Sequence, residues 1–235
     1  LLAPAVANSG SISAQSGSVA LAAGDAVGLD FRGDGLITVR VEQGALNALA
    51  ENKGLLQADN GQVLLTARAA DALARSTVNN AGVVQARGLV ADGGTIRLVG
   101  DGLVQAGRLD ASSSHGQGGS VTVAGGFVAL DGAVRADGVR GGSVAVTAAG
   151  DLSAAAALSA SGTAGKGGSI RLGAGASLVE NTAASSNVGG ADGGTVSLQA
   201  GGSLLSSGRH DARGASGIGG RVDISGADVR LMGAS

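Results

Sequence analysis

Gly93-Gly94-Thr95-Ile96-Arg97-Leu98 is the stretch from which the fold of this chain can be worked out. Its pattern is two glycines, a polar residue, and then two aliphatic residues on either side of a variable one. The pattern returns at 118–123 (GGSVTV), 141–146 (GGSVAV), 167–172 (GGSIRL), 193–198 (GGTVSL) and 219–224 (GGRVDI). The second glycines stand at 94, 119, 142, 168, 194 and 220, so successive copies are 25, 23, 26, 26 and 26 residues apart. A fixed period of this length indicates a repeat architecture.

Each copy of the glycine phrase predicts a turn followed by a strand. The glycine pair is expected to turn the chain because glycine reaches positive φ without a Cβ clash. The alternation after it is typical of a half-buried strand. If the copies stack, one column points inward: Ile96, Val121, Val144, Ile170, Val196 and Val222. The outward column is Arg97, Thr122, Ala145, Arg171, Ser197 and Asp223. Such a stack is a parallel β-solenoid with strands about 4.8 Å apart.

Two further strands are expected in each rung. A phrase of the form Asn-x-Gly followed by alternating residues begins at Asn8, Asn52 and Asn80. The same strand persists at 107–111, 132–136 and 208–212, and weaker copies lie at 150–160 and 173–186. A short apolar segment also follows the glycine phrase, at Phe127–Leu130, Ser177–Val179 and Ser203–Leu205. The sequence therefore predicts one elongated all-β domain of roughly nine rungs with three short strands in each.

The first third of the chain is less regular. Residues 27–31 and 36–41 are expected to be strands joined by Arg32-Gly33-Asp34-Gly35. The segments 44–50 (GALNALA) and 67–75 (ARAADALAR) are rich in alanine and leucine, which favour helices. We expect both to be short helical excursions from corners of the solenoid, supported by it because so short a helix is marginal alone.

The composition excludes several classes of protein. One proline among 45 glycines excludes collagen, and regular aliphatic alternation argues against disorder. The net charge of −2, without a basic patch, argues against nucleic acid as a partner. Without cysteine there is no disulfide, and no apolar run reaches the ~18 residues of a membrane span. Leu1–Ala7 is either the tail of a signal peptide or a strand cut open at the chain boundary.

Residues 1–86 resemble a known secretion module in five stretches. These are 3–12 (APAVANSGSI), 19–31 (VALAAGDAVGLDF), 44–52 (GALNALAEN), 57–68 (QADNGQVLLTAR) and 78–86 (VNNAGVVQA). They are similar to the later part of the secretion domain of filamentous haemagglutinin-like exoproteins, the large bacterial adhesins of two-partner secretion systems. Residues 87–235 resemble, in style, the β-helical repeats that follow that domain. The early part of the module, with its Asn-Pro-Asn-Gly type of motif, is absent from this chain.

The resemblance implies a fold, a route and a role. The fold would be a right-handed parallel β-helix, with the secretion module in 1–86 continuous with a repeat shaft in 87–235. The protein would pass unfolded through an outer-membrane barrel partner, fold outside, and act at the bacterial surface or in the matrix in adhesion, biofilm formation and virulence. Its partners would be that transporter and an exopolysaccharide or host-cell receptor. We expect a monomeric rod, and exposed ends that favour end-to-end association of the isolated segment.

Few residues in the chain suggest a binding site. Arg32-Gly33-Asp34 is an integrin-type adhesive motif, and it is equally a turn between two strands. His115 and His210 should lie about four rungs apart, too far for a shared zinc or catalytic site. His210-Asp211, beside Arg209 and Arg213, could bind an anion, although a solvated face is the favoured interpretation.

Three functions can be set against one another. The first is a rigid stalk without catalytic activity, cofactor or metal. The second is direct glycan or exopolysaccharide binding along an exposed sheet. The third is a β-helical polysaccharide-degrading enzyme, which would need clustered carboxylates and usually aromatic platforms. The chain has no tryptophan or tyrosine, and its acids mostly stand beside glycine at expected corners: Asp101, Asp131, Asp137, Asp151 and Asp192. The sequence thus favours the stalk.

Overall fold

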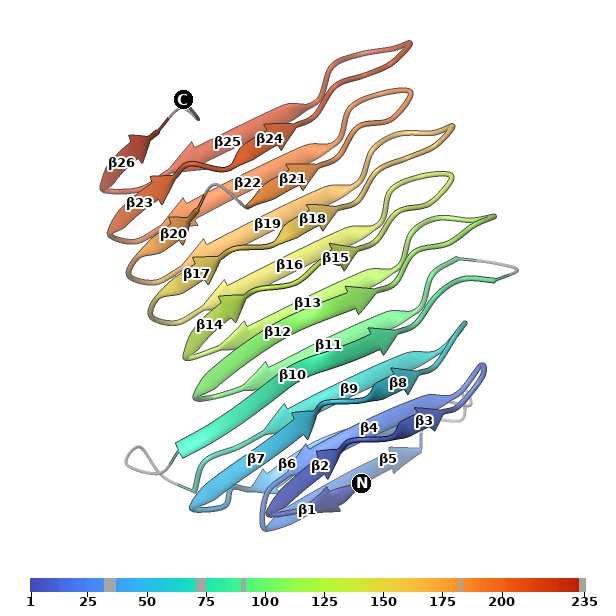
Figure 1. Ribbon diagram of the computed structural model, residues 1–235, viewed down its shortest axis with the longest axis vertical. Helices are drawn as coiled ribbons and strands as arrows, with labels where there is room; N and C mark the ends of the chain where they lie inside the picture. The colour runs from blue at the N-terminus through green and yellow to red at the C-terminus, as the bar shows by residue number, and fades with distance from the viewer. Residues whose placement is uncertain (32–36, 71–74, 90–91, 182–183, 233–235) are drawn as a thin grey trace.

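The chain forms a parallel β-solenoid of about seven turns (Figure 1). The computed structural model describes residues 1–31, 37–70, 75–89, 92–181 and 184–232. Every regular element in these ranges is a strand, and they contain no helix. The all-β parallel β-helix expected from the repeats is therefore confirmed, and the strand stack gives the molecule its long axis.

The first sheet, here sheet A, holds the strands of the glycine phrase. Its nine strands are all parallel, and each pairs with the equivalent strand of the next turn. In order they are β1 (Leu2–Ala3), β4 (Ser18–Ala23), β9 (Gln62–Ala67), β11 (Thr95–Gly100), β13 (Ser120–Gly125), β16 (Ser143–Ala148), β19 (Ser169–Ala174), β22 (Thr195–Ala200) and β25 (Arg221–Ser225).

The second sheet, sheet B, lies opposite sheet A and has two columns of strands (Figure 1). The first column is β2 (Ala5–Asn8), β7 (Asn47–Asn52), β14 (Phe127–Leu130), β17 (Leu152–Ala154), β20 (Leu178–Glu180), β23 (Ser203–Ser206) and β26 (Asp228–Leu231). The second column is β3 (Ser11–Ser13), β8 (Leu55–Gln57), β15 (Val134–Arg135), β18 (Ala157–Ser159), β21 (Ser185–Asn187) and β24 (Arg209–Asp211). Two longer strands, β10 (Arg75–Gln85) and β12 (Leu103–Asp110), run through both columns and join them. The expected three short strands per turn are therefore present wherever β10 and β12 do not merge two of them.

One antiparallel hairpin departs from the solenoid. It consists of β5 (Ala26–Phe31) and β6 (Ile37–Gln43), which pair with each other alone among the described strands. Arg68 ties it down, because its Nη1 donates to the carbonyl oxygen of Val41 at 3.1 Å and to that of Glu42 at 3.3 Å. The Val41 side chain is buried. The two strands expected on either side of residues 32–35 are thus confirmed.

The core is a slim aliphatic column between the two sheets. Five of the six residues expected to point inward from the glycine phrase, from Ile96 to Val196, are at most 1% exposed. Val222 is the exception at 41%, since it belongs to the last strand of sheet A. Burying one such side chain stabilises the fold by about 1.5–3 kcal/mol. The register matches the expected columns, with Ile96 beside Val121 and Arg97 beside Thr122.

The glycines of the phrase are required for a reason other than the expected one. None of them has φ in the left-handed region, so turning by positive φ is not their role. Instead, a Cβ at Gly119 would overlap the carbonyl oxygen of Gly94 in the preceding turn, and one at Gly142 would overlap that of Gly119. The backbones of adjacent turns approach so closely at this corner that only glycine fits.

The helical excursion predicted at 44–50 is wrong, and the one predicted at 67–75 is wrong for the residues of that segment that the structure describes. The first segment leads into β7, which pairs with β2 on one side and β10 on the other. In the second, Ala67 ends β9, Ala69 bridges to Ala45, and Arg75 begins β10, while residues 71–74 lie outside the described ranges. Intrinsic helix propensity is a weak bias, and a ladder with neighbours on both sides overrides it.

The number of turns is also lower than the roughly nine predicted. About seven turns are formed. The hairpin accounts for part of the difference, because it takes up residues 26–43, less than one repeat, without adding a rung. Strand pairing runs without a break across residue 86, from β9 to β11 and from β10 to β12. The division into a secretion module at 1–86 and a shaft at 87–235 stays a prediction.

Candidate functional site

The adhesive motif suggested by the sequence, Arg32-Gly33-Asp34, lies outside the described residues. Its flanking strands, β5 and β6, are in place as a hairpin. The integrin-type interpretation and the turn interpretation both stay predictions.

The aspartate carboxylates at the corners accept hydrogen bonds from the backbone of the next turn. Asp92 accepts a hydrogen bond from the backbone N–H of Gln117 at 2.7 Å, and Asp192 accepts one from that of Ile218 at 2.9 Å. The same contact joins Asp59 to Arg87, Asp137 to Ser161 and Asp151 to Ser177. Each carboxylate satisfies a backbone N–H that lies outside the strands and has no ladder partner. These acids therefore join successive turns, whereas the sequence indicated only that they favour turns.

The two histidines occupy separate sites. His115 lies after β12 and His210 in β24, four strands further along sheet B. His115 is exposed, and its Nδ1 lies 2.8 Å from the Ser114 hydroxyl and 3.1 Å from the carbonyl oxygen of Leu89. The two histidines therefore lie far apart, and the predicted separation of about four rungs is confirmed.

His210 instead belongs to a buried polar cluster inside the solenoid. Its Nε2 lies 3.3 Å from Oε2 of Glu180 and 3.3 Å from the Ser206 hydroxyl, which donates to the same carboxylate at 2.7 Å. Glu180 is 1% exposed. In the preceding turn the position of Glu180 is filled by Ala154, whereas that of His210 is filled by the buried Ser186 and, one turn earlier still, by Leu158. Polar side chains thus replace apolar ones in this part of the core. The strand register alone would have placed Glu180 on the inward face.

The anion site considered around Asp211 stays a prediction, because the structure pairs only one of the two arginines beside it. The Arg213 guanidinium donates two bonds to the Asp211 carboxylate from Nε, at 2.9 and 3.0 Å. That side-chain hydrogen bond, followed by one from the Arg213 backbone N–H, holds the pKa of Asp211 below its ordinary value. His210 turns inward and Arg213 is paired with Asp211, which leaves Arg209 as the exposed cation of this segment without a partner among the described residues.

A ladder of buried asparagines explains the Asn-x-Gly phrase. Nδ2 of Asn8 donates to Oδ1 of Asn52 at 2.9 Å, and Nδ2 of Asn52 donates to Oδ1 of Asn80 at 2.8 Å. The Oδ1 of Asn52 also accepts from the backbone N–H of Gly54 two residues on. Asn52 and Asn80 are fully buried. The phrase is therefore a turn and an inter-turn bond combined.

The outward face of sheet A carries an aligned column of hydroxyl groups that the sequence analysis overlooked. The third residue of each glycine phrase forms it: Thr95, Ser120, Ser143, Ser169 and Thr195, paired in register. The hydroxyls of Ser143 and Ser120 are 3.3 Å apart. The signal was present in the phrase itself, because its third residue is serine or threonine in five of the six copies.

A groove lies where the hairpin meets sheet A. It has a volume of about 500 Å³ and is walled by β6 at Val39–Val41. Its floor is the outward face of β4, β9 and β11, including Leu64, Arg97 and Val99, and Arg68 and Asp101 line it as well. The Asp101 carboxylate accepts from the backbone N–H of Ala69 at 3.0 Å and from the Ser76 hydroxyl.

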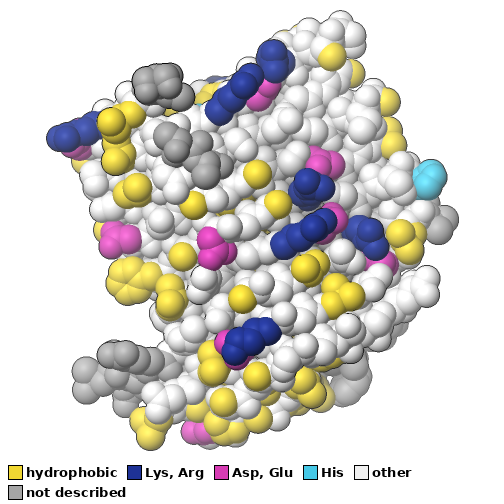
Figure 2. Space-filling model, in the orientation of Figure 1, with side chains coloured by type: hydrophobic (Ala, Val, Ile, Leu, Met, Phe, Trp, Pro, Cys, Tyr) yellow, Lys and Arg dark blue, Asp and Glu magenta, His cyan; other side chains and the backbone are white. Residues whose placement is uncertain are grey.

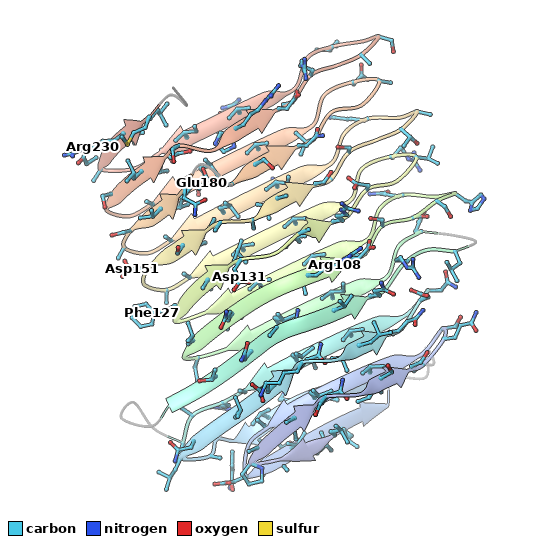
Figure 3. The ribbon with its side chains drawn as sticks, in the orientation of Figure 1. Arg108, Phe127, Asp131, Asp151, Glu180 and Arg230 are labelled. Atoms are coloured by element: carbon cyan, nitrogen blue, oxygen red, sulfur yellow. The ribbon has the colours of Figure 1, made fainter. Side chains whose placement is uncertain are left out.

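Charged side chains of both signs are mixed on the face formed by sheet B (Figure 2). On the side seen in Figure 2, basic and acidic side chains lie next to one another rather than in a patch of one sign. Phe127 projects at the corner of this face and is 55% exposed, with Asp131 and Asp151 nearby on the same side (Figure 3). An exposed ring of this kind is a single contact point and not a platform.

Two searches over the described part of the chain gave negative results. No group of three or more histidine, cysteine, aspartate or glutamate side chains there is placed to hold a metal ion. None of the described residues forms a helix with the length and apolar character needed to cross a bilayer.

The fold and these sites define the chain as a parallel β-helical repeat protein. Comparison with models of known protein families and with curated proteins gave no match.

Proposed function

We propose that this chain is a rigid shaft segment of a large secreted bacterial surface adhesin, without catalytic activity of its own. The observation that carries the proposal is the unbroken in-register ladder of sheet A from β1 to β25. Strands hydrogen-bonded to both neighbours resist bending and extension, and each turn adds a fixed length of about 4.8 Å. Such a rod places whatever binds at its tip far from the cell surface.

The side chains support a structural role over a catalytic one. The acids that could have served as general acid and base are used as acceptors for backbone amides of the next turn, as with Asp151 and Asp192. Glycosidases need two carboxyl groups facing a shared space. A carboxylate committed to an inter-turn bond is unsuited to that role.

Export by two-partner secretion belongs to the proposal through the resemblance of residues 1–86. The physical support is that solenoid turns contact only their neighbours, so folding can begin at one end and propagate. Folding outside the cell would draw the chain outward through an outer-membrane barrel. Without cysteine, no disulfide can form before transit.

A deletion of one whole repeat tests the shaft role. Removing residues 143–168 joins Gly142 to Ser169, so that the phrase and its register are kept. In bacteria producing the full protein, we expect surface display and attachment to continue. The matched control removes residues 143–155, half a repeat, and should abolish folding and display. Normal display with loss of attachment after the whole-repeat deletion would show that these turns bind the receptor themselves.

Export is tested separately, by producing the protein with and without its outer-membrane barrel partner. We expect surface accumulation only with the barrel, and accumulation without it would overturn the two-partner route.

The hydroxyl column of sheet A favours direct glycan binding as a second candidate function. Aligned serine and threonine side chains, from Thr95 to Thr195, could bond successive sugar hydroxyls. A glycan array with the isolated chain decides between the candidates. Saturable binding that is lost on replacing Ser120, Ser143 and Ser169 by alanine would establish the binder.

A further inference from the structure

We propose that the groove between β6 and the outward face of β9 and β11 binds an extended acidic peptide segment of a partner protein. This inference concerns a site separate from the shaft and holds whether or not the chain is exported as proposed above. The groove, of about 500 Å³, is within the size range of ordinary ligand sites.

The shape of the groove suits an extended chain. Its lining follows the direction of the sheet A strands, from Gln62 at the start of β9 to Arg68 just beyond its end. β6 forms the wall and pairs only with β5 among the described strands, so its second edge has no strand beside it. An open strand edge beside a groove is the arrangement in which peptides bind by adding a strand.

The floor of the groove is more apolar than the same face elsewhere. Leu64 and Val99 lie on it, each half-buried. In the register of sheet A, the column of Leu64 continues as Thr122, Ala145, Arg171 and Ser197, and the column of Val99 as Ala124, Thr147 and Gly173. The large aliphatic side chains are thus confined to the turns beside the hairpin, and alternate side chains of a bound strand could pack on them.

The charge of the groove selects an acidic ligand. Arg97 is exposed and forms no hydrogen bond or ion pair with any described residue. Arg40, exposed on β6, and Arg68 also line the groove, although Arg68 already donates to backbone carbonyls of β6. The one carboxylate in the lining, Asp101, is held by Ala69 and Ser76 and so does not neutralise Arg97. A carboxylate of the ligand could form an ion pair with the Arg97 guanidinium.

The same residues argue for a peptide over a glycan. The lining contains no aromatic side chain on which a sugar ring could stack. The groove combines aliphatic contacts, a strand edge with no described strand beside it, and exposed guanidinium groups on Arg40 and Arg97. An extended peptide alternating aliphatic and acidic residues would match these features.

The test measures fluorescence polarisation of a labelled peptide of alternating valine and glutamate, about six residues long to match β9. A peptide with lysine in place of glutamate is the matched probe. With the whole chain of residues 1–235, we expect saturable binding of the glutamate peptide, at least about tenfold tighter than that of the lysine peptide. The affinity should fall as salt is raised from about 0.05 to 0.5 M.

Three variants locate the site. Arg97→Glu should weaken binding of the glutamate peptide by about tenfold or more. Arg171→Glu, in the same outward column but outside the groove, should leave it within about twofold. Leu64→Ser should weaken binding through the floor, and it keeps the fold because later turns carry Thr122 and Ser197 in that column. Circular dichroism confirms that each variant is folded.

Several outcomes would overturn the proposal. These are no saturable binding of the glutamate peptide, equal affinity for both peptides, or equal effects of Arg97→Glu and Arg171→Glu. A glycan array hit that Arg97→Glu abolishes, without peptide binding, would assign the groove to an acidic glycan instead.

Discussion

Replacing Gly141 by alanine should destabilise the solenoid although it adds only a methyl group at a corner. A Cβ at this position would overlap the carbonyl oxygen of Ala160 and the amide nitrogen of Gly168 in the next turn. Since packed atoms cannot overlap, the next turn would have to retreat by roughly 1 Å. Positive φ plays no part, because Gly141 is not in the left-handed region.

The size of the effect follows from the hydrogen bonds at this corner. The N–H of Gly141 donates to the carbonyl oxygen of Lys166 at 3.0 Å, and the N–H of Ser169 donates to that of Gly142 at 3.0 Å. A retreat of that size breaks both, at about 1–3 kcal/mol for each buried group left unsatisfied. Alanine also restricts the unfolded chain, which returns about 0.4–1 kcal/mol. We therefore expect a net loss of about 1–5 kcal/mol in the free energy of unfolding.

The assay is urea denaturation followed by circular dichroism, with amide hydrogen exchange to locate the loosened turn. Gly219→Ala is the matched control, because it changes the same position of the phrase where nothing lies within 4 Å of the added Cβ. We expect that control to change stability by less than about 0.5 kcal/mol. If the two variants lose the same stability, close backbone approach is not what the glycine phrase provides.

Three further predictions concern polar groups between the turns. Asn52→Ala should cost about 2–4 kcal/mol in urea denaturation, because it breaks the asparagine ladder on both sides; a loss under about 0.5 kcal/mol would contradict this. Asp192→Ala should speed hydrogen exchange of the Ile218 amide and lower the free energy of unfolding by about 1 kcal/mol. Unchanged exchange would contradict a stabilising role for this hydrogen bond. His210→Leu alone should lower the melting temperature, because it leaves the buried Glu180 carboxylate with only the Ser206 hydroxyl as partner. Adding Glu180→Ala should restore or raise it, and a further drop in the double variant would argue against this account.

The resemblance to an exported adhesin and the columns of the solenoid rest on different grounds. The columns follow from period and alternation, and the register of Ile96 beside Val121 confirms them. The export route rests on likeness in 1–86 alone, and it therefore stands as a proposal with its own test.

The sequence by itself determined the parallel β-solenoid, the inward and outward columns of the glycine phrase, and the hairpin strands around residues 32–35. These could be predicted because a repeated phrase states the same local preference six times, and a period of two fixes which side chains are buried. Because all six copies of the glycine phrase show the same alternation, each supports the strand predicted for the others.

Only the tertiary structure decided what depends on contacts between turns. It made a strand, not a helix, of Asn47–Asn52, since neighbours on both sides outweigh helix propensity. It also assigned the glycines to close backbone packing, brought Glu180 to His210 across 30 residues of sequence (210 − 180), and placed β6 beside the face that carries Arg97. Such relations are set by distances between segments that are remote in the chain, and no local pattern encodes them.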